Sequence, residues 1–207
     1  MKKNYQIIME EIIKNLGSTK KLLLHSCCGP CSSYVISTLT PYFDITILYY
    51  NPNIEPYEEY LKRKAEEIRF IKEFPNVNKL DFMDCDYDNE KFKRLAKGLE
   101  NEREGGARCI KCYYERLDKT ALLAKESNFD YFCTTLTVSP YKNSTIINEL
   151  GAKLEEKYGI KYLYSDFKKK DGYKESIRLS QEYELYRQDY CGCNYSKEER
   201  EELLKNK

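Results

Sequence analysis

The sequence has no tryptophan, a single histidine and almost no net charge. Its 35 lysines and arginines balance 34 aspartates and glutamates, which excludes a protein that acts mainly as a polycation and leaves room only for a local basic patch. No uncharged run approaches the ~18 residues that a membrane span needs. The opening stretch, MKKNYQIIMEEII, has two glutamates among its apolar residues and is typical of an amphipathic helix, not of a signal peptide. We therefore expect a cytoplasmic protein.

Glycine is scarce where a nucleotide-binding protein would need it. The first predicted strand, Lys21–Ser26, runs into the sequence HSCCGPCSS, which contains one glycine. A loop that cradles phosphate is rich in glycine, because its backbone amides must approach the phosphate closely. A loop lined by thiolates would instead repel phosphate. The sequence therefore argues against ATP binding and nucleotide hydrolysis.

Short apolar runs alternate with amphipathic helical patterns along the chain. The predicted strands are Lys21–Ser26, Asp44–Tyr50, Lys79–Met83, Tyr131–Thr135 and Ile160–Ser165. The predicted helices include Tyr34–Leu39 and a helix from Tyr173 to about Arg187. Strands separated by helices predict a three-layer α/β/α fold with a central parallel sheet. We expect one domain over residues 1–207, with a catalytic core at 18–195 and a charged C-terminal helix at 197–207. In such folds, ligands bind beyond the carboxyl ends of the strands.

What the sequence does contain is cysteine: nine residues, of which seven form three groups. The groups are Cys27, Cys28 and Cys31 in HSCCGPC, Cys109 and Cys112 in RCIKCYY, and Cys191 and Cys193 in YCGCN. Without an export signal these thiols are expected to stay reduced. Clustered reduced cysteines indicate metal ligands or redox groups rather than structural disulfides.

The spacing within the groups suits thiolate ligands. Cys109 and Cys112 are three residues apart at the start of a predicted helix, so their sulfurs share one face, and the helix dipole there favours the thiolate form. Cys28 and Cys31 have the same spacing. The pair in YCGCN flanks a glycine whose backbone can approach an ion closely.

The seven grouped thiols are three more than the four that complete one iron–sulfur cluster or one zinc site. Because the adjacent residues Cys27 and Cys28 are expected to point their side chains apart, they need not serve the same metal. The count therefore indicates two neighbouring metal centres, or one cluster with a redox-active dithiol that could form a disulfide. One structural zinc with spare thiols is the alternative, since thiolates bind zinc and iron–sulfur clusters alike.

Three other residues with reactive side chains are expected to have structural roles. Cys133 follows two aromatic residues in a predicted strand, which indicates a packed core thiol. Cys85 has no partner nearby in the sequence. His25 ends a buried strand and is expected to be a satisfied core imidazole, with a role in proton transfer as the alternative.

Four motifs in this order, HSCCGPC, RCIKCYYERL, TTLTVSPYKN and YRQDYCGC, resemble those of the QueH-type epoxyqueuosine reductases. The resemblance extends from about Leu22 to Asn194 and includes all three cysteine groups. It implies a fold related to the adenine-nucleotide α-hydrolases, with metal ligands in place of the nucleotide loop. It also implies reduction of epoxyqueuosine to queuosine at the tRNA wobble position, with electrons from an unidentified donor and without ATP.

Carried over residue by residue, the resemblance implies a 4Fe–4S cluster and an adjacent second iron. The implied cluster ligands are Cys28, Cys31, Cys109 and Cys112, and the implied ligands of the second iron are Cys27, Cys191 and Cys193. A thiolate-bound cluster can supply electrons of low potential, and an iron with an open coordination position can polarise the epoxide oxygen.

Substrate contacts are predicted in three loops. The candidate catalytic residues are Cys27, Asp189 and Tyr141, and the candidate substrate ligands are Asn51, Asn53, Ser139, Lys142, Asn143 and Arg187. Lys142 could meet a phosphate, and one of Arg187, Gln188 and Asp189, which directly precede the last cysteine group, could orient a ligand or donate a proton. An ordinary turn at residues 51–53 and a helix N-cap at Asn143 or Ser144 beside a solvated lysine are the alternatives.

Two other functions explain part of the pattern. A thiol–disulfide oxidoreductase would use Cys28 and Cys31, or the YCGCN pair, and would leave the remaining cysteines idle. A zinc-containing RNA-binding protein would use the thiols for structure alone. ATP-dependent tRNA thiolation is disfavoured by the missing phosphate loop.

Overall fold

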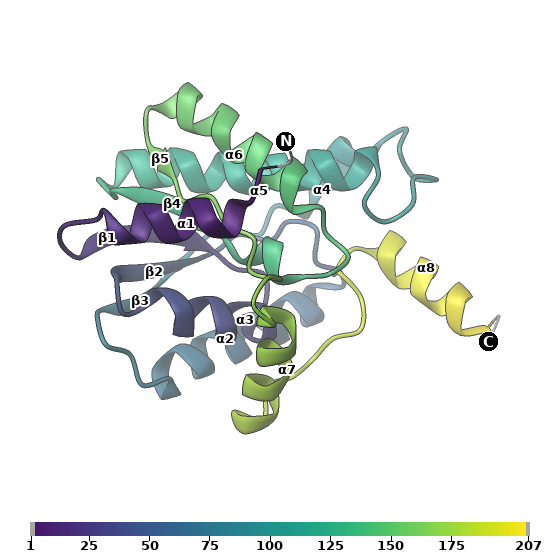
Figure 1. The fold of residues 1–207 in the computed structure, drawn as a ribbon. Helices are drawn as coiled ribbons and strands as arrows, with labels where there is room; N and C mark the ends of the chain where they lie inside the picture. The colour runs from purple at the N-terminus through teal and green to yellow at the C-terminus, as the bar shows by residue number, and fades with distance from the viewer. Residues whose placement is uncertain (1–2, 206–207) are drawn as a thin grey trace.

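The computed structural model describes residues 3–205 and is built on a sheet with helices on both faces (Figure 1). The strands are β1 (Lys20–His25), β2 (Phe43–Tyr49), β3 (Leu80–Asp84), β4 (Tyr131–Thr134) and β5 (Lys161–Tyr162). Their order across the sheet is β3-β2-β1-β4-β5, and every neighbouring pair is parallel. The predicted parallel sheet is confirmed.

The central strand β1 is buried on both sides, as its continuous apolar run predicts. Leu22 and Leu24 pack in one core cluster and Leu23 in the other, because successive side chains of a strand point to opposite faces. From β1 the chain builds outward to β3 and then returns on the other side of β1 with β4. The order in which successive strands are added to the sheet therefore reverses between β1 and β4. Ligands bind at such a reversal point in folds of this class.

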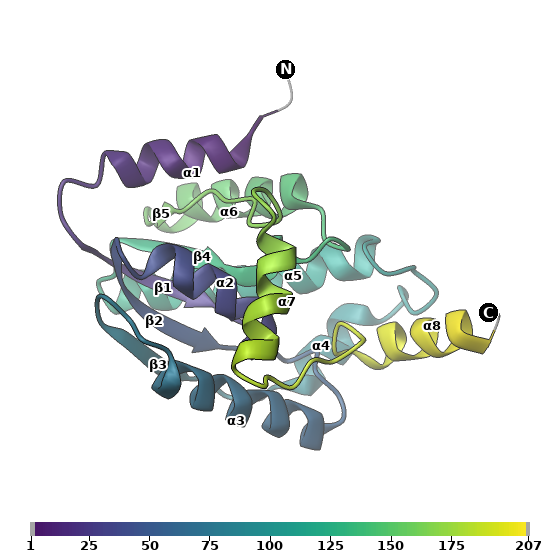
Figure 2. The same ribbon diagram turned by 60° about the horizontal axis from the view of Figure 1, so that its bottom comes forward.

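Helices cover both faces of the sheet, and the C-terminal helix extends away from it (Figure 2). They are α1 (Tyr5–Lys14), α2 (Gly29–Leu39), α3 (Tyr57–Glu73), α4 (Asn89–Ala96), α5 (Ala107–Glu126), α6 (Ser144–Tyr158), α7 (Gly172–Glu182) and α8 (Asn194–Lys205), with a 3₁₀ turn, η1 (Thr135–Val138), after β4. Helices α1, α2 and α3 contribute to the core cluster that contains Leu22, and α5 and α6 to the cluster that contains Leu23. The predicted three-layer α/β/α arrangement is confirmed.

Three helix boundaries differ from the prediction and affect the site. Helix α2 begins at Gly29, so Cys31 lies in its first turn. Helix α7 ends at Glu182, well before Arg187, because Glu184 adopts a φ of 50°, which a right-handed helix cannot accommodate. Helix α8 begins at Asn194 and projects away from the sheet (Figure 1), and positions 206–207 of the predicted C-terminal helix lie outside the described residues.

Over residues 3–205, no helix combines the length and the apolar character that crossing a bilayer requires.

Candidate active site and metal centre

The first cysteine group lies where β1 passes into α2. Cys27 and Cys28 follow the strand, and Cys31 lies in the first helical turn beside Pro30, a position where the missing N–H of proline costs nothing. The Cys27 and Cys28 sulfurs are 3.9 Å apart, and all three sulfurs lie within 4.8 Å of one another. The expectation that the Cys27 and Cys28 side chains point apart is therefore wrong. The backbone is extended at Cys28 and turns directly into the helix, which brings the three sulfurs together.

The other two cysteine groups come from the start of α5 and from the loop before α8. Cys109 belongs to the same buried cluster as Cys27, and Cys112 packs with Cys193. Burial raises the pKa of Cys112 to about 12, and the nearby Cys191 adds to the effect. All nine cysteines are free thiols. The structure thus brings together the three groups that the sequence pattern identified.

A cavity of about 640 Å³ lies beside these thiols, and we call it the thiol cavity. Among the residues that line it are three of the predicted metal ligands, Cys27, Cys31 and Cys191. Its lining also includes the predicted polar residues Ser139, Tyr141, Lys142, Arg187 and Asp189. These residues follow β1, β4 and α7, so the cavity lies at the carboxyl edge of the sheet, where the fold predicts a ligand.

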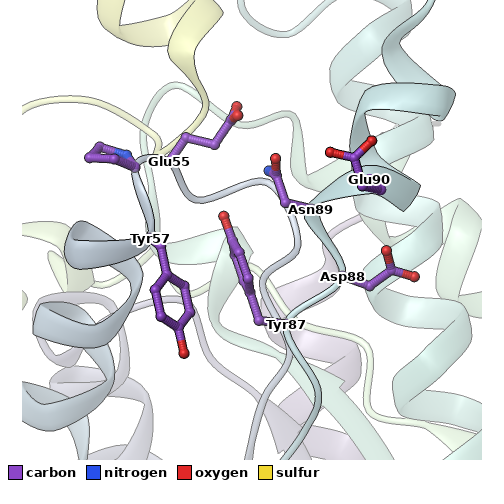
Figure 3. Close-up of a pocket in the computed structure, with 7 residues that line it drawn as sticks. Glu55, Tyr57, Tyr87, Asp88, Asn89 and Glu90 are labelled. Atoms are coloured by element: carbon purple, nitrogen blue, oxygen red, sulfur yellow. The ribbon is translucent and has the colours of Figure 1, made fainter.

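A second cavity, of about 430 Å³, has a different lining (Figure 3). Its side chains are acidic groups, tyrosines, a proline and an asparagine from segments 55–57 and 87–90. It contains no cysteine and no residue of the predicted site. The chemistry expected from the sequence therefore lies in the thiol cavity.

Three predicted substrate ligands lie outside the lining of the thiol cavity. Asn51 and Asn53 are each 1% exposed, and the Asn51 amide donates to the Ser26 carbonyl oxygen over 2.8 Å. Asn143 caps α6, where its side-chain oxygen accepts from the Thr145 N–H over 2.9 Å. The turn forms at residues 51–53 and the N-cap at Asn143, both of which the sequence left open as alternatives. The side-chain oxygens of Asn51 and Asn53 are buried and have no hydrogen-bond partner among the described residues.

Lys142 is a nearly buried cation in the cavity lining, 8% exposed. Burial alone lowers the pKa of Lys142, but the attraction of Cys191 and Tyr113 outweighs burial, so the pKa is raised and the ammonium group stays charged. Within residues 3–205, no carboxylate lies within ion-pair distance of Lys142. Its charge is therefore available to an anion in the cavity.

Arg116 of α5 is a second cation near the thiols and is 1% exposed. Its Nε–H donates to the Cys112 carbonyl oxygen over 3.3 Å, and its buried Nη2 has no partner among the described residues. Burial lowers the pKa of Arg116, but the attraction of Cys112 and Cys191 outweighs it and raises the pKa. A buried guanidinium without a carboxylate is costly unless another negative group lies nearby, and metal-bound thiolates would provide one.

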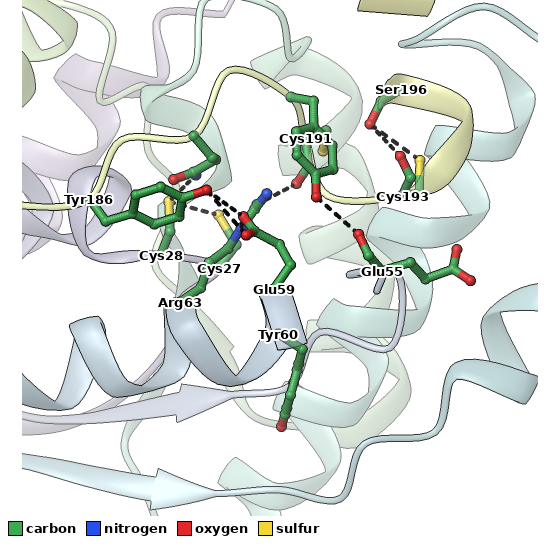
Figure 4. Close-up of polar contacts among 12 residues, drawn as sticks. Cys27, Cys28, Glu55, Glu59, Tyr60, Arg63, Tyr186, Cys191, Cys193 and Ser196 are labelled. Atoms are coloured by element: carbon green, nitrogen blue, oxygen red, sulfur yellow. Dashed lines mark hydrogen bonds and ion pairs between the residues drawn. The ribbon is translucent and has the colours of Figure 1, made fainter. Parts of the chain in front are cut away.

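Arg63 of α3 holds the loop that carries Cys191 (Figure 4). Its Nε–H pairs with Glu59 over 2.7 Å, and its Nη1 donates to the Cys191 carbonyl oxygen over 3.1 Å. The Tyr190 ring covers the guanidinium at 4.9 Å, and the Tyr186 hydroxyl donates to Glu59 over 3.1 Å. Arg63 is not among the predicted site residues, because its partner lies 128 residues away and no local pattern marks such a pair.

The donor set and its surroundings fit a thiolate-bound iron–sulfur cluster. Soft thiolates are the ligands of such clusters, and the first group places three sulfurs within 4.8 Å of one another. The buried charges of Arg116 and Lys142 would balance the negative charge of metal-bound sulfur. The site is thus suited to hold a reduced, anionic metal group beside a cavity for substrate.

Comparison with known proteins places the chain in a family. The family model described as "Epoxyqueuosine reductase QueH" matches residues 22–199. A relative of that name from Streptococcus pyogenes serotype M1 is 44% identical over 198 residues, which cover 93% of this chain and 78% of the relative. Another, from Staphylococcus epidermidis, is 43% identical over 200 residues, which cover 93% of this chain and 84% of the relative.

A solved structure shares the fold. The structure described as U34-tRNA thiolase NcsA from Methanococcus maripaludis with its [4Fe-4S] cluster aligns with a TM-score of 0.50 and 16% sequence identity, covering 96% of this chain and 71% of that one. The likeness concerns the fold alone and agrees with the predicted α/β/α fold with a central parallel sheet. On the family model and the relatives together, the chain belongs to the epoxyqueuosine reductase QueH family.

Proposed function

We propose that this protein reduces epoxyqueuosine in tRNA to queuosine. In this reaction both C–O bonds of the epoxide break, a C=C bond forms, and two electrons and two protons are consumed as the oxygen leaves as water. The observation that carries the proposal is the convergence of three separate cysteine groups beside one substrate-sized cavity. A thiol–disulfide oxidoreductase or a zinc-containing RNA-binding protein would not require all three groups and the cavity together.

We propose that the seven grouped cysteines hold a 4Fe–4S cluster and a second iron. In this proposal the cluster is bound by Cys28, Cys31, Cys109 and Cys112. The second iron is bound by Cys27, Cys191 and Cys193. The cavity lining contains Cys27 and Cys191, which supports placing the second iron next to substrate. The 3.9 Å between the Cys27 and Cys28 sulfurs implies that the two metal centres adjoin. When bound, the metals supply low-potential electrons and a Lewis acid for the departing oxygen.

The protein's own polar residues bind and orient the substrate. Lys142 keeps its charge at the cavity wall and is suited to hold a phosphate of the anticodon loop. Tyr141, 75% exposed, and Asp189, also exposed, line the same cavity and can bring a proton to the departing oxygen. The Arg187 guanidinium donates to the Ser180 hydroxyl over 2.9 Å, so it has N–H groups left for substrate.

The partners of the reaction are a tRNA with a queuosine-type anticodon loop and a separate electron donor. We propose that ATP takes no part, because cysteines occupy the loop after β1, where a phosphate-binding protein of this fold would have glycines.

The test is anaerobic reconstitution with iron and sulfide, followed by incubation with epoxyqueuosine-containing tRNA, a chemical reductant and nucleoside analysis. We expect bound iron and sulfide, a coloured protein and conversion of the epoxide to queuosine. A colourless, metal-free protein that is active would favour the thiol–disulfide function. Stoichiometric zinc in protein purified without oxygen, with no turnover, would favour the zinc-containing RNA-binding protein.

A further inference from the structure

The Gln188 side chain makes a contact that neither the fold nor the cysteine pattern requires. Its Nε2 lies 2.8 Å from the Cys28 sulfur, across 160 residues of sequence. Its Oε1 is buried and has no hydrogen-bond partner among the described residues. The same side chain lines the thiol cavity. Gln188 therefore lies between a proposed metal ligand and the space proposed for substrate.

The segment around Gln188 is held in place on both sides. The Tyr186 N–H donates to Glu66 over 2.7 Å, and the Tyr190 hydroxyl donates to the Glu55 carbonyl oxygen over 3.0 Å. These contacts tie an irregular loop to α3 and to the segment before it. The loop therefore holds the amide of Gln188 against the sulfur.

The chemistry of the two groups fixes the direction of the contact. A metal-bound cysteine sulfur carries no proton and can only accept, so the amide nitrogen of Gln188 is the group that faces it. Hydrogen bonds to cluster sulfurs raise the reduction potential of the cluster. The amide oxygen is left without a partner, and a buried acceptor of this kind is stable only when another donor reaches it.

We propose that Gln188 is a positioning residue that links the metal centre to substrate: its N–H donates to the Cys28 sulfur, and its Oε1 accepts from an O–H or N–H group of the bound nucleoside. The first contact keeps the reduction potential of the cluster higher than it would be if the Cys28 sulfur accepted no hydrogen bond. The second orients the nucleoside relative to the metal. The inference rests on the proposed function for the identity of the substrate.

Two substitutions separate the two contacts. Gln188→Glu keeps an acceptor oxygen but loses the N–H donor, and Gln188→Leu loses both. We expect both variants to have a lower cluster potential than the wild type in an anaerobic redox titration followed by electron paramagnetic resonance. We expect KM for epoxyqueuosine-containing tRNA to rise about tenfold in Gln188→Leu but less than threefold in Gln188→Glu. Gln181→Leu, on the exposed surface of α7, is the matched control and should change neither quantity.

The outcomes distinguish this inference from the proposed function. An unchanged potential in Gln188→Leu would overturn the sulfur contact, and an unchanged KM would overturn the substrate contact. If the wild type reduces no epoxide but the potential still falls in Gln188→Leu, the proposed function fails and the sulfur contact stands. If no cluster assembles, the sulfur contact fails as stated, and the dissociation constant of the metal-free protein for the tRNA tests the other contact. Thermal unfolding of each variant confirms that it folds.

Discussion

Cysteine side chains of one chemistry occupy two kinds of environment in this protein. Cys27 and Cys31 lie at the carboxyl edge of the sheet and line the thiol cavity. Cys133 lies within β4, fully buried, with its sulfur 3.2 Å from the Leu163 carbonyl oxygen. Its sulfur faces that carbonyl and the Ser165 hydroxyl within the core, so it serves as a small core side chain, as its sequence context predicted.

The difference between cysteines at the site and the core thiol predicts opposite outcomes for two alanine substitutions. Cys109→Ala removes a proposed ligand and is expected to abolish both the absorption of the cluster and product formation. Cys133→Ala removes only a buried sulfur, costs roughly 1 to 2 kcal/mol of stability and keeps both properties. Absorption spectra and nucleoside analysis of the two variants, reconstituted side by side, provide the check. Full activity in the first, or a colourless second variant, would overturn the assignment of ligands.

His25 is a residue whose environment determines its charge. Its Nδ1 lies 2.9 Å from the Thr134 hydroxyl and its Nε2 3.2 Å from the Tyr50 carbonyl oxygen, so both nitrogens are satisfied in the neutral ring. Burial lowers the pKa of His25 from 6.5 to about 3, and the nearby Arg116 adds to the effect. The structure confirms the core imidazole predicted from the sequence.

A pH dependence of stability follows from His25. Between pH 6.5 and about 3 the unfolded chain binds a proton on this ring that the folded chain does not, so folding stability falls as the pH falls through this window. From about pH 6 to pH 5, the wild type should lose roughly 1 kcal/mol more stability than His25→Gln, in which the group is absent. Urea unfolding of both proteins at each pH measures the difference. Parallel losses in the two proteins would contradict it.

The sequence could identify which residue types gather at the site, but not where every polar side chain points. The motif spacing placed Ser139, Lys142 and Asp189 near the thiols, and they do line the cavity. Asn51 and Asn53 follow β2 in a turn, and the same turn chemistry is compatible with a side chain directed inward or outward. Only the packing of the surrounding elements decides between the two directions.

At the scale of elements, the loop between α7 and α8 is the part of the fold that completes the site. It has no regular structure of its own, and side chains of α3 hold it in place (Figure 4). Arg69 donates to the Tyr183 carbonyl oxygen over 2.9 Å at the start of the loop, and Arg63 donates to that of Cys191 near its end. Helix α3 therefore serves as the support on which the last cysteine group is positioned.

Removing the Arg63 contact should loosen this loop. We expect Arg63→Met to lower the free energy of unfolding by roughly 3 kcal/mol, because it leaves Glu59 without its buried partner. Amide hydrogens of residues 186–193 should exchange faster with solvent, which mass spectrometry can follow. Arg178→Met, which removes exposed ion pairs with Glu175 and Glu182, is the control and should change stability by less than about 0.5 kcal/mol. Unchanged exchange in Arg63→Met would show that other contacts hold the loop.

Apolar periodicity was enough to predict the order and type of the main elements, because each β-strand and helix has its own local pattern. It predicted α7 to continue to Arg187, because nothing in the local sequence marks the left-handed turn at Glu184. That turn is stabilised by contacts with α3, which no local pattern contains. The loop that carries Gln188 was therefore the least predictable part of the site.

At the scale of the whole molecule, near-neutral net charge coexists with cations concentrated at one site. The total of 35 basic and 34 acidic residues gives no hint of nucleic-acid binding, whereas Lys142 and Arg116 both lie near the thiols without carboxylate partners among the described residues. A tRNA partner would then be bound by a few well-placed charges, not by a broad basic face.

The role proposed for Lys142 can be tested through salt dependence. Lys142→Gln should weaken tRNA binding and reduce the slope of log affinity against log salt concentration by about 1, the value for one lost phosphate contact. Lys153→Gln, exposed on α6 and outside the cavity lining, should leave both quantities unchanged. Titrations at several salt concentrations give the slope. An unaltered slope in Lys142→Gln would exclude a phosphate contact at this position.

The distance along the chain between the converging cysteines also sets a condition on folding. The strands that frame the cavity, β1 and β4, are parallel and are joined by contacts that span 109 residues, which form late because a long loop must close first. Until they form, nine free thiols share a loosely ordered chain in which many wrong pairs can meet and oxidise. Refolding should therefore succeed only in the presence of a reductant. The redox state of the surroundings then governs how the chain folds as well as the chemistry proposed for the folded protein.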